Sequence, residues 1–229
     1  MTSILLIDDD TDLVELLRDY LSRDGFTVTA AYSAADGLVE ALSGRHAIAV
    51  LDVMLPHTSG LDVLRRIRRE STLPVLMLTA RGDHADCIAG LELGADDYVT
   101  KPCTPRTLAA RLRAILRRTT LEAGADRSGG SLVCGALQMW PQQRRARWQG
   151  SPLALTSTEF GLLELLLRQA GRPVSKAELS EHALGRPLGK HDRSIDVHMS
   201  SVRRKLGTLP DGRSRIHTVH RIGYQLIKE

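Results

Sequence analysis

The sequence predicts two domains of different fold classes: an α/β first half built on a five-stranded, parallel, doubly wound sheet, and a smaller α+β second half. Short β-rich runs alternate with amphipathic helical stretches in the first half, a pattern typical of parallel strands joined by crossover helices. The net charge also changes sign between the halves: residues 1–122 carry 14 Lys and Arg against 18 Asp and Glu, whereas residues 123–229 carry 17 against 9.

The elements of the first half follow from apolar runs and helical spacing. The expected strands are Ile4–Ile7, Thr27–Ala31, Ile48–Leu51, Val75–Leu78 and Tyr98–Val99. Between them, leucines repeat at the three- to four-residue spacing of amphipathic helices. The last helix is expected to begin at Pro105, with Thr104 as its N-cap, and to end near Arg118.

A segment of small polar residues and glycine, Thr119–Ser131, is typical of a flexible linker. We therefore expect domains at 1–119 and 132–229, joined by a linker at 120–131. The second domain is expected to open with short strands. They are Leu132–Trp140, Arg145–Gln149 and Leu153–Leu155.

Three helices and a terminal hairpin complete the second domain. Capping boxes at Thr156–Glu159 and Ser175–Glu178 open the first two helices. A third helical run, about Arg193–Leu206, is followed by a hairpin of Ile216–Val219 and Tyr224–Ile227. The residues that the third helix turns to the core are Ile195, Met199, Val202 and Leu206. This order is that of a winged helix-turn-helix, and the basic charge indicates a polyanion partner; a merely well-solvated basic domain is the alternative.

The composition is that of a soluble globular protein, with 42% hydrophobic and 25% charged residues. No apolar run approaches the roughly 20 residues that span a bilayer. The N-terminus lacks the basic flank of a signal peptide, and the three cysteines show neither disulfide nor zinc spacing. These observations predict a cytoplasmic protein with no membrane partner.

Polar side chains follow four of the predicted parallel strands. They are Asp8 and Asp9, Asp52, Thr79 and Lys101. Ligands of an open parallel sheet bind beyond the carboxyl ends of its strands, so we expect these groups to converge. Converging carboxylates repel one another, and a hard cation such as Mg²⁺ relieves that repulsion. A carboxylate beside a metal, a hydroxyl and an ammonium group is suited to phosphoryl transfer onto aspartate.

Several motifs resemble those of one family. The strings Leu5–Asp10, Leu51–Pro56, Leu78–Arg81 and Asp96–Pro102 resemble the flavodoxin/CheY-like receiver domain of response regulators. The strings Leu155–Phe160, Asp192–His198, Arg203–Leu206 and Gly223-Tyr224 resemble the OmpR/PhoB family, and Gly185–Leu206 looks most like its CpxR-type regulators. The resemblance covers nearly the whole chain. It implies a two-component response regulator that a sensor histidine kinase phosphorylates. It further implies a homodimer, paired through the receivers on phosphorylation, that regulates transcription with RNA polymerase at tandem promoter half-sites.

The resemblance assigns the acidic residues to particular tasks. Asp52 is the expected phosphoacceptor. Asp9, Asp52 and the backbone carbonyl of Met54 are expected to ligate Mg²⁺, while Asp8 acts through a water molecule.

The same resemblance assigns the remaining receiver residues. Thr79 and Lys101 are expected to contact the phosphoryl group, and Lys101-Pro102 is expected to be a cis peptide bond. Tyr98 corresponds to a switch aromatic whose rotamer reports the position of Thr79. An ordinary half-buried aromatic is the alternative for Tyr98.

On the DNA-binding half, the third helix is the expected recognition helix. Its face opposite the core should expose Arg193, Val197, Ser200, Ser201 and Arg204. The residues expected at DNA are Arg193, Val197, His198, Ser201, Arg203, Arg204, His220 and Arg221. For His198, packing within the domain is the alternative to a phosphate contact. The resemblance implies that Val197 and Ser201 lie nearest the base edges, and that Arg193 and Arg203 suit phosphates. Relatives read Arg-Gly-X-Gly-Tyr at the wing, so Arg221 stands in the place of a turn glycine.

The family pairs its receivers through salt bridges. The residues expected on this dimer face are Asp96, Asp97, Arg111 and Arg118. Cys87 and Thr107 stand where the family has one such ion pair, so this bridge is expected to be missing.

Two alternatives come from other classes. An aspartate-nucleophile phosphatase needs a second acid two residues after the nucleophile, where this chain has Met54. We therefore expect no enzyme, beyond slow self-dephosphorylation at most. A receiver that only dimerises and is never phosphorylated is the other alternative, against which the complete set of acids, Thr79 and Lys101 argues.

Overall fold

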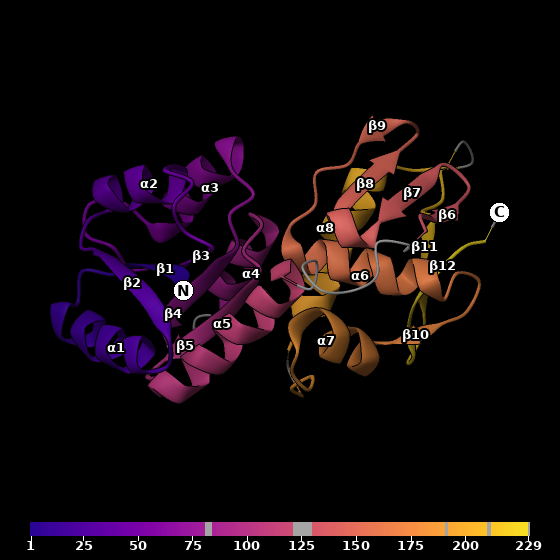
Figure 1. Cartoon of the computed structure of the whole chain (residues 1–229). Coiled ribbons are helices and arrows are strands. Elements are labelled where there is room, and N and C mark those ends of the chain that lie inside the picture. The colour runs from indigo at the N-terminus through magenta and orange to yellow at the C-terminus, as the bar shows by residue number, and fades with distance from the viewer. Residues whose placement is uncertain (81–83, 121–129, 191, 210–211, 229) are drawn as a thin grey trace. The chain divides into compact units, whose positions relative to one another are not determined.

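The computed structural model describes residues 1–80, 84–120, 130–190, 192–209 and 212–228. Contacts divide the chain into two compact units, Met1–Leu116 and Arg117–Glu229 (Figure 1). Most of the predicted linker, 120–131, lies outside the described residues, so the domain boundaries at 119 and 132 stay predictions.

The first unit is the α/β domain that the sequence predicts. Its strands are β1 (Thr2–Ile7), β2 (Phe26–Ala31), β3 (Ile48–Asp52), β4 (Val75–Ala80) and β5 (Asp97–Lys101). Its helices are α1 (Thr11–Arg23), α2 (Ala34–Leu42), α3 (Gly60–Glu70), α4 (His84–Glu92) and α5 (Pro105–Thr120), of which the residues from Arg117 onward belong to the second unit. The five strands form one parallel sheet in the order β2-β1-β3-β4-β5. Strand order reverses between β1 and β3, which marks the edge where such sheets bind ligands.

Side chains alternate between the two faces of this sheet. Leu6 belongs to the cluster that α1 and α5 cover, together with Leu17 and Leu112. Ile7 points the other way, against Gly37 of α2, where an added Cβ would lie 2.6 Å from its Cγ2. The sheet is therefore buried on both faces, and its carboxyl edge is left to the polar residues that end the strands.

The second unit is α+β, as predicted. It begins with an antiparallel sheet of β6 (Leu132–Cys134), β7 (Leu137–Trp140), β8 (Arg145–Trp148) and β9 (Ser151–Pro152), with a 3₁₀ turn, η1 (Pro141–Gln143), after β7. Helices α6 (Ser157–Arg168), α7 (Lys176–Leu184) and α8 (Ser194–Leu206) follow. A second sheet holds β10 (Val174–Ser175), β12 (Gly223–Leu226) and β11 (Ile216–Val219), in that order.

Two strand predictions in this unit were wrong. Leu132–Trp140 is two strands joined by a turn at Gly135, whose φ is 54°. Leu153–Leu155 is not a strand, because Gln149 and Gly150 both take positive φ and turn the chain so that the hairpin ends with Arg147 pairing Pro152.

The starts of α6 and α7 are set by the predicted capping residues. Thr156 and Glu159 form a complete capping box at α6, with the backbone N–H of Thr156 donating to Oε2 of Glu159 at 2.8 Å. The hydroxyl of Ser175 accepts from the N–H of Glu178 at α7. Gly185 ends α7 in the left-handed conformation, which glycine adopts most readily. None of the helices in the described ranges combines the length and apolar character needed to cross a membrane.

Candidate functional site

Three carboxylates meet at the carboxyl edge of the first sheet. Asp8 and Asp9 follow β1, Asp52 ends β3, and one oxygen from each lies within 4.8 Å of the other two. Asp8 and Asp52 are buried, whereas Asp9 is exposed. The structure therefore brings the three predicted acids together, because β1 and β3 are neighbours in the sheet.

Lys101 lies between the two buried acids. Its Nζ is 2.7 Å from Oδ2 of Asp8 and 3.1 Å from Oδ2 of Asp52. Burial by itself would lower the pKa of Lys101, but hydrogen bonds to both carboxylates outweigh it and the pKa is raised. Burial raises the pKa of Asp8, although Lys101 and the N–H of Asp10 donate to it. One ammonium group does not neutralise three carboxylates, so the negative charge of the site favours a further cation.

Thr79 completes the polar set from β4. Its hydroxyl oxygen is buried and has no hydrogen-bond partner among the described residues. Leaving such a group unsatisfied costs on the order of 1–3 kcal/mol, and native proteins avoid it except where a ligand supplies the partner. Thr79 follows Leu78, which pairs with Asp52 across the β3–β4 ladder, so this hydroxyl belongs to the same edge.

Gly60 is a site residue that sequence reasoning missed. It begins α3 and donates its N–H to the carbonyl of Val53 at 2.9 Å. A Cβ at this position would lie 1.9 Å from the carbonyl oxygen of Asp52. The start of α3 therefore packs directly on the backbone of Asp52. No local sequence pattern indicates this role, because it depends on the distance between α3 and β3.

A pocket opens beside the acids on the same edge. It is lined by Asp9, Val53, Met54, Leu55, Pro56, His57, Thr58, Ser59 and Asp86. The side chain of Met54 is 66% exposed, and the role predicted for its carbonyl stays a prediction.

The other receiver residues lie along β5 and just after it. Tyr98 is half-buried and pairs with Met77, and the switch role stays a prediction. The Lys101-Pro102 bond is cis, as expected. Cys103 is half-buried, and burial raises the pKa of its thiol.

The dimer-face role predicted for Asp96, Asp97, Arg111 and Arg118 stays a prediction, and each of them has a partner within its own unit. Asp96 is fully buried, because its carboxylate accepts from the N–H of Val75 at 3.0 Å and from Arg68 at 3.3 Å. Asp97 is also buried and pairs with Arg111 at 2.8 Å within the chain.

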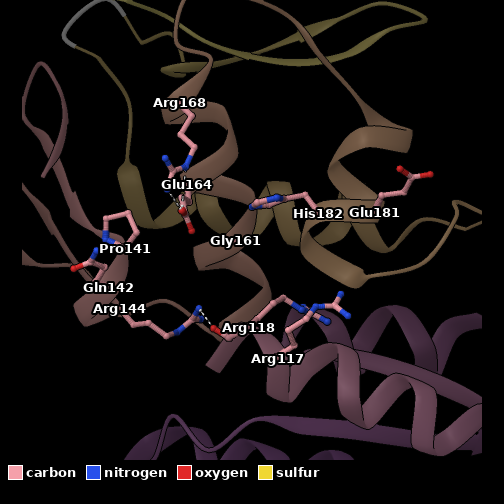
Figure 2. Close-up of a pocket in the computed structure, with 10 residues that line it drawn as sticks. All are labelled: Arg117, Arg118, Pro141, Gln142, Arg144, Gly161, Glu164, Arg168, Glu181 and His182. Atoms are coloured by element: carbon pink, nitrogen blue, oxygen red, sulfur yellow. Dashed lines mark hydrogen bonds and ion pairs between the residues drawn. The ribbon is translucent and has the colours of Figure 1, made fainter. Parts of the chain in front are cut away.

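Arg118 belongs to the second unit. There its guanidinium donates to Oγ1 of Thr158 at 3.0 Å and to the carbonyl of Ala183. Figure 2 shows the pocket that it lines, with Arg144 reaching its carbonyl at 2.7 Å. Elsewhere on the pocket wall Arg168 pairs with Glu164. These arginines are thus engaged inside the unit.

Helix α8 exposes only part of the face that the sequence predicted. Arg193, Ser200 and Arg204 are exposed as expected, but Val197 and Ser201 are buried. His198 is buried too, which agrees with the packed alternative. The predicted core residues Ile195, Met199, Val202 and Leu206 are all buried as well. The helix is covered on two sides, so the part of its surface that can meet DNA is narrower than the apolar pattern indicated.

The burial of Ser201 has a specific cause in Glu159. The Ser201 hydroxyl donates to Oε1 of Glu159 at 2.7 Å, and Nζ of Lys205 lies 2.5 Å from Oε2. Burial alone would raise the pKa of Glu159, but Lys205 and the hydrogen bonds lower it below its ordinary value of 4.5. The capping residue of α6 therefore also anchors α8.

Replacing Glu159 by glutamine is expected to destabilise the second unit by about 1–3 kcal/mol, less than for a fully buried pair because Lys205 is about one third exposed. Because folding lowers the pKa of Glu159, its ionised carboxylate stabilises the fold at pH values above its pKa in the unfolded chain. This stabilisation is lost as the pH falls through the lower pKa of the folded state. Urea unfolding at several pH values, followed by tryptophan fluorescence, measures this, because both tryptophans, Trp140 and Trp148, lie in the second unit.

The matched control is Glu164→Gln, which removes the more exposed pair with Arg168 and should cost less than about 1 kcal/mol. Equal losses for the two variants would contradict an anchoring role for Glu159.

The wing residues lie where the sequence placed them. His220 and Arg221 are exposed in the turn between β11 and β12. Arg203 is half-buried, and its guanidinium donates to the carbonyl of Ile216 and the hydroxyl of Thr218, both on β11. The phosphate contact expected of Arg203 therefore competes with contacts inside the domain.

Two family models match the chain. The response regulator receiver domain matches residues 4–113, and the C-terminal domain of transcriptional regulatory proteins matches residues 150–226. These matches fall on the first and second units respectively.

Relatives match over the full length. The transcriptional regulatory proteins CpxR of Klebsiella pneumoniae and of Escherichia coli K12 are each 42% identical, over 99% of this chain and 99% of their own. The crystal structure of response regulator DrrB, an OmpR/PhoB homologue of Thermotoga maritima, superposes with a TM-score of 0.52 at 28% identity over 99% of both chains. The chain therefore belongs to the OmpR/PhoB-type response regulators close to CpxR, and it is a DNA-binding response regulator of a two-component system.

Proposed function

We propose that Asp52 accepts a phosphoryl group from the phosphohistidine of a sensor kinase and that this transfer controls DNA binding. The buried, unpartnered hydroxyl of Thr79 is the observation that carries the proposal, since a phosphoryl oxygen is the acceptor that it lacks. Lys101, already hydrogen-bonded to Asp52, supplies a second donor at the same edge.

The chemistry follows from these groups. A carboxylate oxygen of Asp52 attacks phosphorus, the phosphorus–nitrogen bond breaks, and the histidine nitrogen leaves with the electron pair. Thr79 and Lys101 donate hydrogen bonds to the phosphoryl oxygens, where negative charge accumulates. Burial of Asp52 keeps water from competing as acceptor.

Three carboxylates within 4.8 Å fit a magnesium ion, a hard cation that prefers oxygen ligands. Asp9, Asp52 and the backbone carbonyl of Met54 would hold it, with Asp8 acting through a water molecule. When bound, it would neutralise charge on the transferred group. No second acid follows Asp52 at position 54, so we propose no phosphatase activity beyond slow self-dephosphorylation.

Magnesium affinity is expected to weaken as the pH falls from neutrality. The weakening should begin at a higher pH than in a site whose aspartates all have their ordinary pKa. The reason is the raised pKa of Asp8, since protons compete with the cation for that carboxylate. Isothermal titration calorimetry at several pH values measures this, and Asp9→Asn should weaken binding at every pH. An affinity that stays constant as acid is added would contradict a role for Asp8 at the cation.

For DNA, we propose that the exposed face of α8 enters the major groove and the wing reaches the minor groove. The observations that support this are the basic charge of the second half and the exposure of Arg193, Arg204, His220 and Arg221. Ser200 is exposed where Ser201 is not, so we propose that it, rather than Ser201, faces the bases.

The similarity to transcriptional regulators supports three further proposals. They are homodimerisation on phosphorylation, binding to tandem half-sites and contact with RNA polymerase. The predicted cytoplasmic location stays a prediction.

The test treats the full chain with a small phosphodonor and Mg²⁺. We expect one base-labile phosphoryl group by intact mass, and tighter binding to a tandem DNA site than to a single one, because pairing raises the effective concentration of the second domain. Stoichiometric phosphorylation without any change in affinity for the tandem site would refute control of DNA binding.

A further inference from the structure

We infer that Tyr224 and Asp196 are positioning residues that lock the wing to the recognition helix and thereby set where the wing meets the minor groove. This inference rests on the proposed DNA contacts of α8 and of the β11–β12 turn. It gives a role in DNA reading to two residues that need not touch DNA.

The first link is a hydrogen bond between the helix and the wing. Asp196, in the first turn of α8, accepts from the hydroxyl of Tyr224 on β12 at 2.6 Å. Its Oδ1 also lies 2.6 Å from Nζ of Lys176 at the start of α7. Tyr224 is only 5% exposed, so this hydroxyl has little access to water as an alternative partner. One carboxylate thus joins both helices of the helix-turn-helix to the wing.

The second link lies two turns further along the same side of α8. The Nε of Arg203 donates to the carbonyl of Ile216 at 2.9 Å, and its NH2 group donates to Oγ1 of Thr218 at 2.8 Å. The guanidinium also stacks over the ring of Tyr224, 5.1 Å from its centroid. Because residues seven apart share a helix face, Asp196 and Arg203 hold the hairpin from both ends of α8.

On its other side, the wing packs too closely against β10 for β12 to shift. Gly223, next to Tyr224, lies so close to β10 that an added Cβ would stand 2.1 Å from the carbonyl of Val174. The ladder pairs Val174 with Tyr224 and Tyr224 with Thr218, so β12 is held between two strands. The wing and α8 therefore form one rigid body with a fixed spacing between the elements that meet the two grooves.

A fixed spacing between the wing and α8 should matter more for the affinity for specific sites than for the affinity for random DNA. A wing displaced from α8 can no longer engage the minor groove while the helix holds its register in the major groove. Binding to random DNA depends on charge, which these contacts leave unchanged. A loss confined to specific sites and to wing contacts is thus the signature of a positioning role.

The experiment uses Tyr224→Phe in the full chain, which keeps the ring and its stacking but removes the hydroxyl. We expect roughly tenfold weaker binding to a specific site, because the change removes one hydrogen bond to a charged group. Binding to random DNA and its salt dependence should stay unchanged. At saturating protein, hydroxyl-radical footprinting should show that the minor groove at the wing is no longer protected. Methylation footprinting should show that the major groove is still protected.

Two comparisons separate positioning from stability. Asp196→Asn keeps an oxygen acceptor and should retain the wing footprint, whereas Asp196→Ala should lose it. The matched control is Tyr32→Phe, which removes a tyrosine–carboxylate bond to Glu15 in the first unit and should change nothing. If Tyr224→Phe does not fold, Thr218→Val can replace it, because this change removes the hydroxyl that accepts a hydrogen bond from Arg203. It should also weaken binding to the specific site and remove the wing's minor-groove protection.

Each other outcome has a definite meaning. Wild-type footprints in Tyr224→Phe overturn the inference, as does an equal loss of major- and minor-groove protection in folded protein. Absence of wing protection in the wild type overturns the proposed wing contact itself, and the inference with it.

Discussion

The Asp52→Ala variant is expected to accept no phosphoryl group under conditions that phosphorylate the wild type stoichiometrically. Asp52 supplies the nucleophilic oxygen, and neither neighbouring acid replaces it. Asp8 and Asp9 are the acids proposed to serve the cation, and Asp9 is also exposed to water, which competes for the phosphoryl group. Intact mass after incubation with a phosphodonor and Mg²⁺ measures the loss.

Two variants sharpen this result. Asp12→Ala removes an exposed acid from the first turn of α1, outside the carboxylate cluster, and should be phosphorylated like the wild type. Asp9→Ala should also prevent phosphorylation, through the cation rather than the nucleophile, so excess Mg²⁺ should restore part of it. Undiminished labelling of Asp52→Ala would mean that another residue is the acceptor.

Gly60→Val is expected to destabilise the first unit by about 3 kcal/mol and to abolish most phosphorylation. The added side chain cannot be placed without displacing backbone, since even its Cβ would stand 1.9 Å from the carbonyl oxygen of Asp52. Either the start of α3 or the end of β3 must move, and the second movement displaces the phosphoacceptor. Urea unfolding by circular dichroism and the rate of phosphorylation measure the two effects.

Gly90→Ala is the control in the same unit. Its Cβ would lie 3.4 Å from Cγ of Met77, an ordinary contact with a flexible side chain, and alanine favours the helix. We expect phosphorylation to be unchanged. A Gly60→Val protein that is as stable and as reactive as the wild type would show that α3 does not press on Asp52.

The receiver half could be predicted closely because parallel strands leave few choices. Runs such as Ile48–Leu51 are apolar throughout and are followed directly by a polar residue, so both the strand and the edge of the site could be located in the sequence. That edge brought Asp8, Asp52 and Lys101 together as expected. Gly60 was missed because its role depends on how closely α3 approaches β3, a distance that no local pattern encodes.

The recognition helix shows the limit of periodicity. Apolar spacing identified the face with Ile195 and Met199 correctly, but it assumed that the opposite face meets solvent. Ser201 is small and polar, and its pattern gives no sign that it turns to a buried carboxylate 42 residues earlier in the chain. Polar contacts between distant residues decide such positions, and the buried bond from the N–H of Val75 to Asp96 is a second example.

The turn of the wing carries a cost that concerns evolution as well as folding. Arg221 takes a φ of 60°, a left-handed conformation that costs an L-residue roughly 1–2 kcal/mol compared with glycine. A glycine here would make the hairpin more stable and would remove a cation from its tip. Selection for thermal robustness and selection for operator affinity therefore act on this one codon in opposite directions.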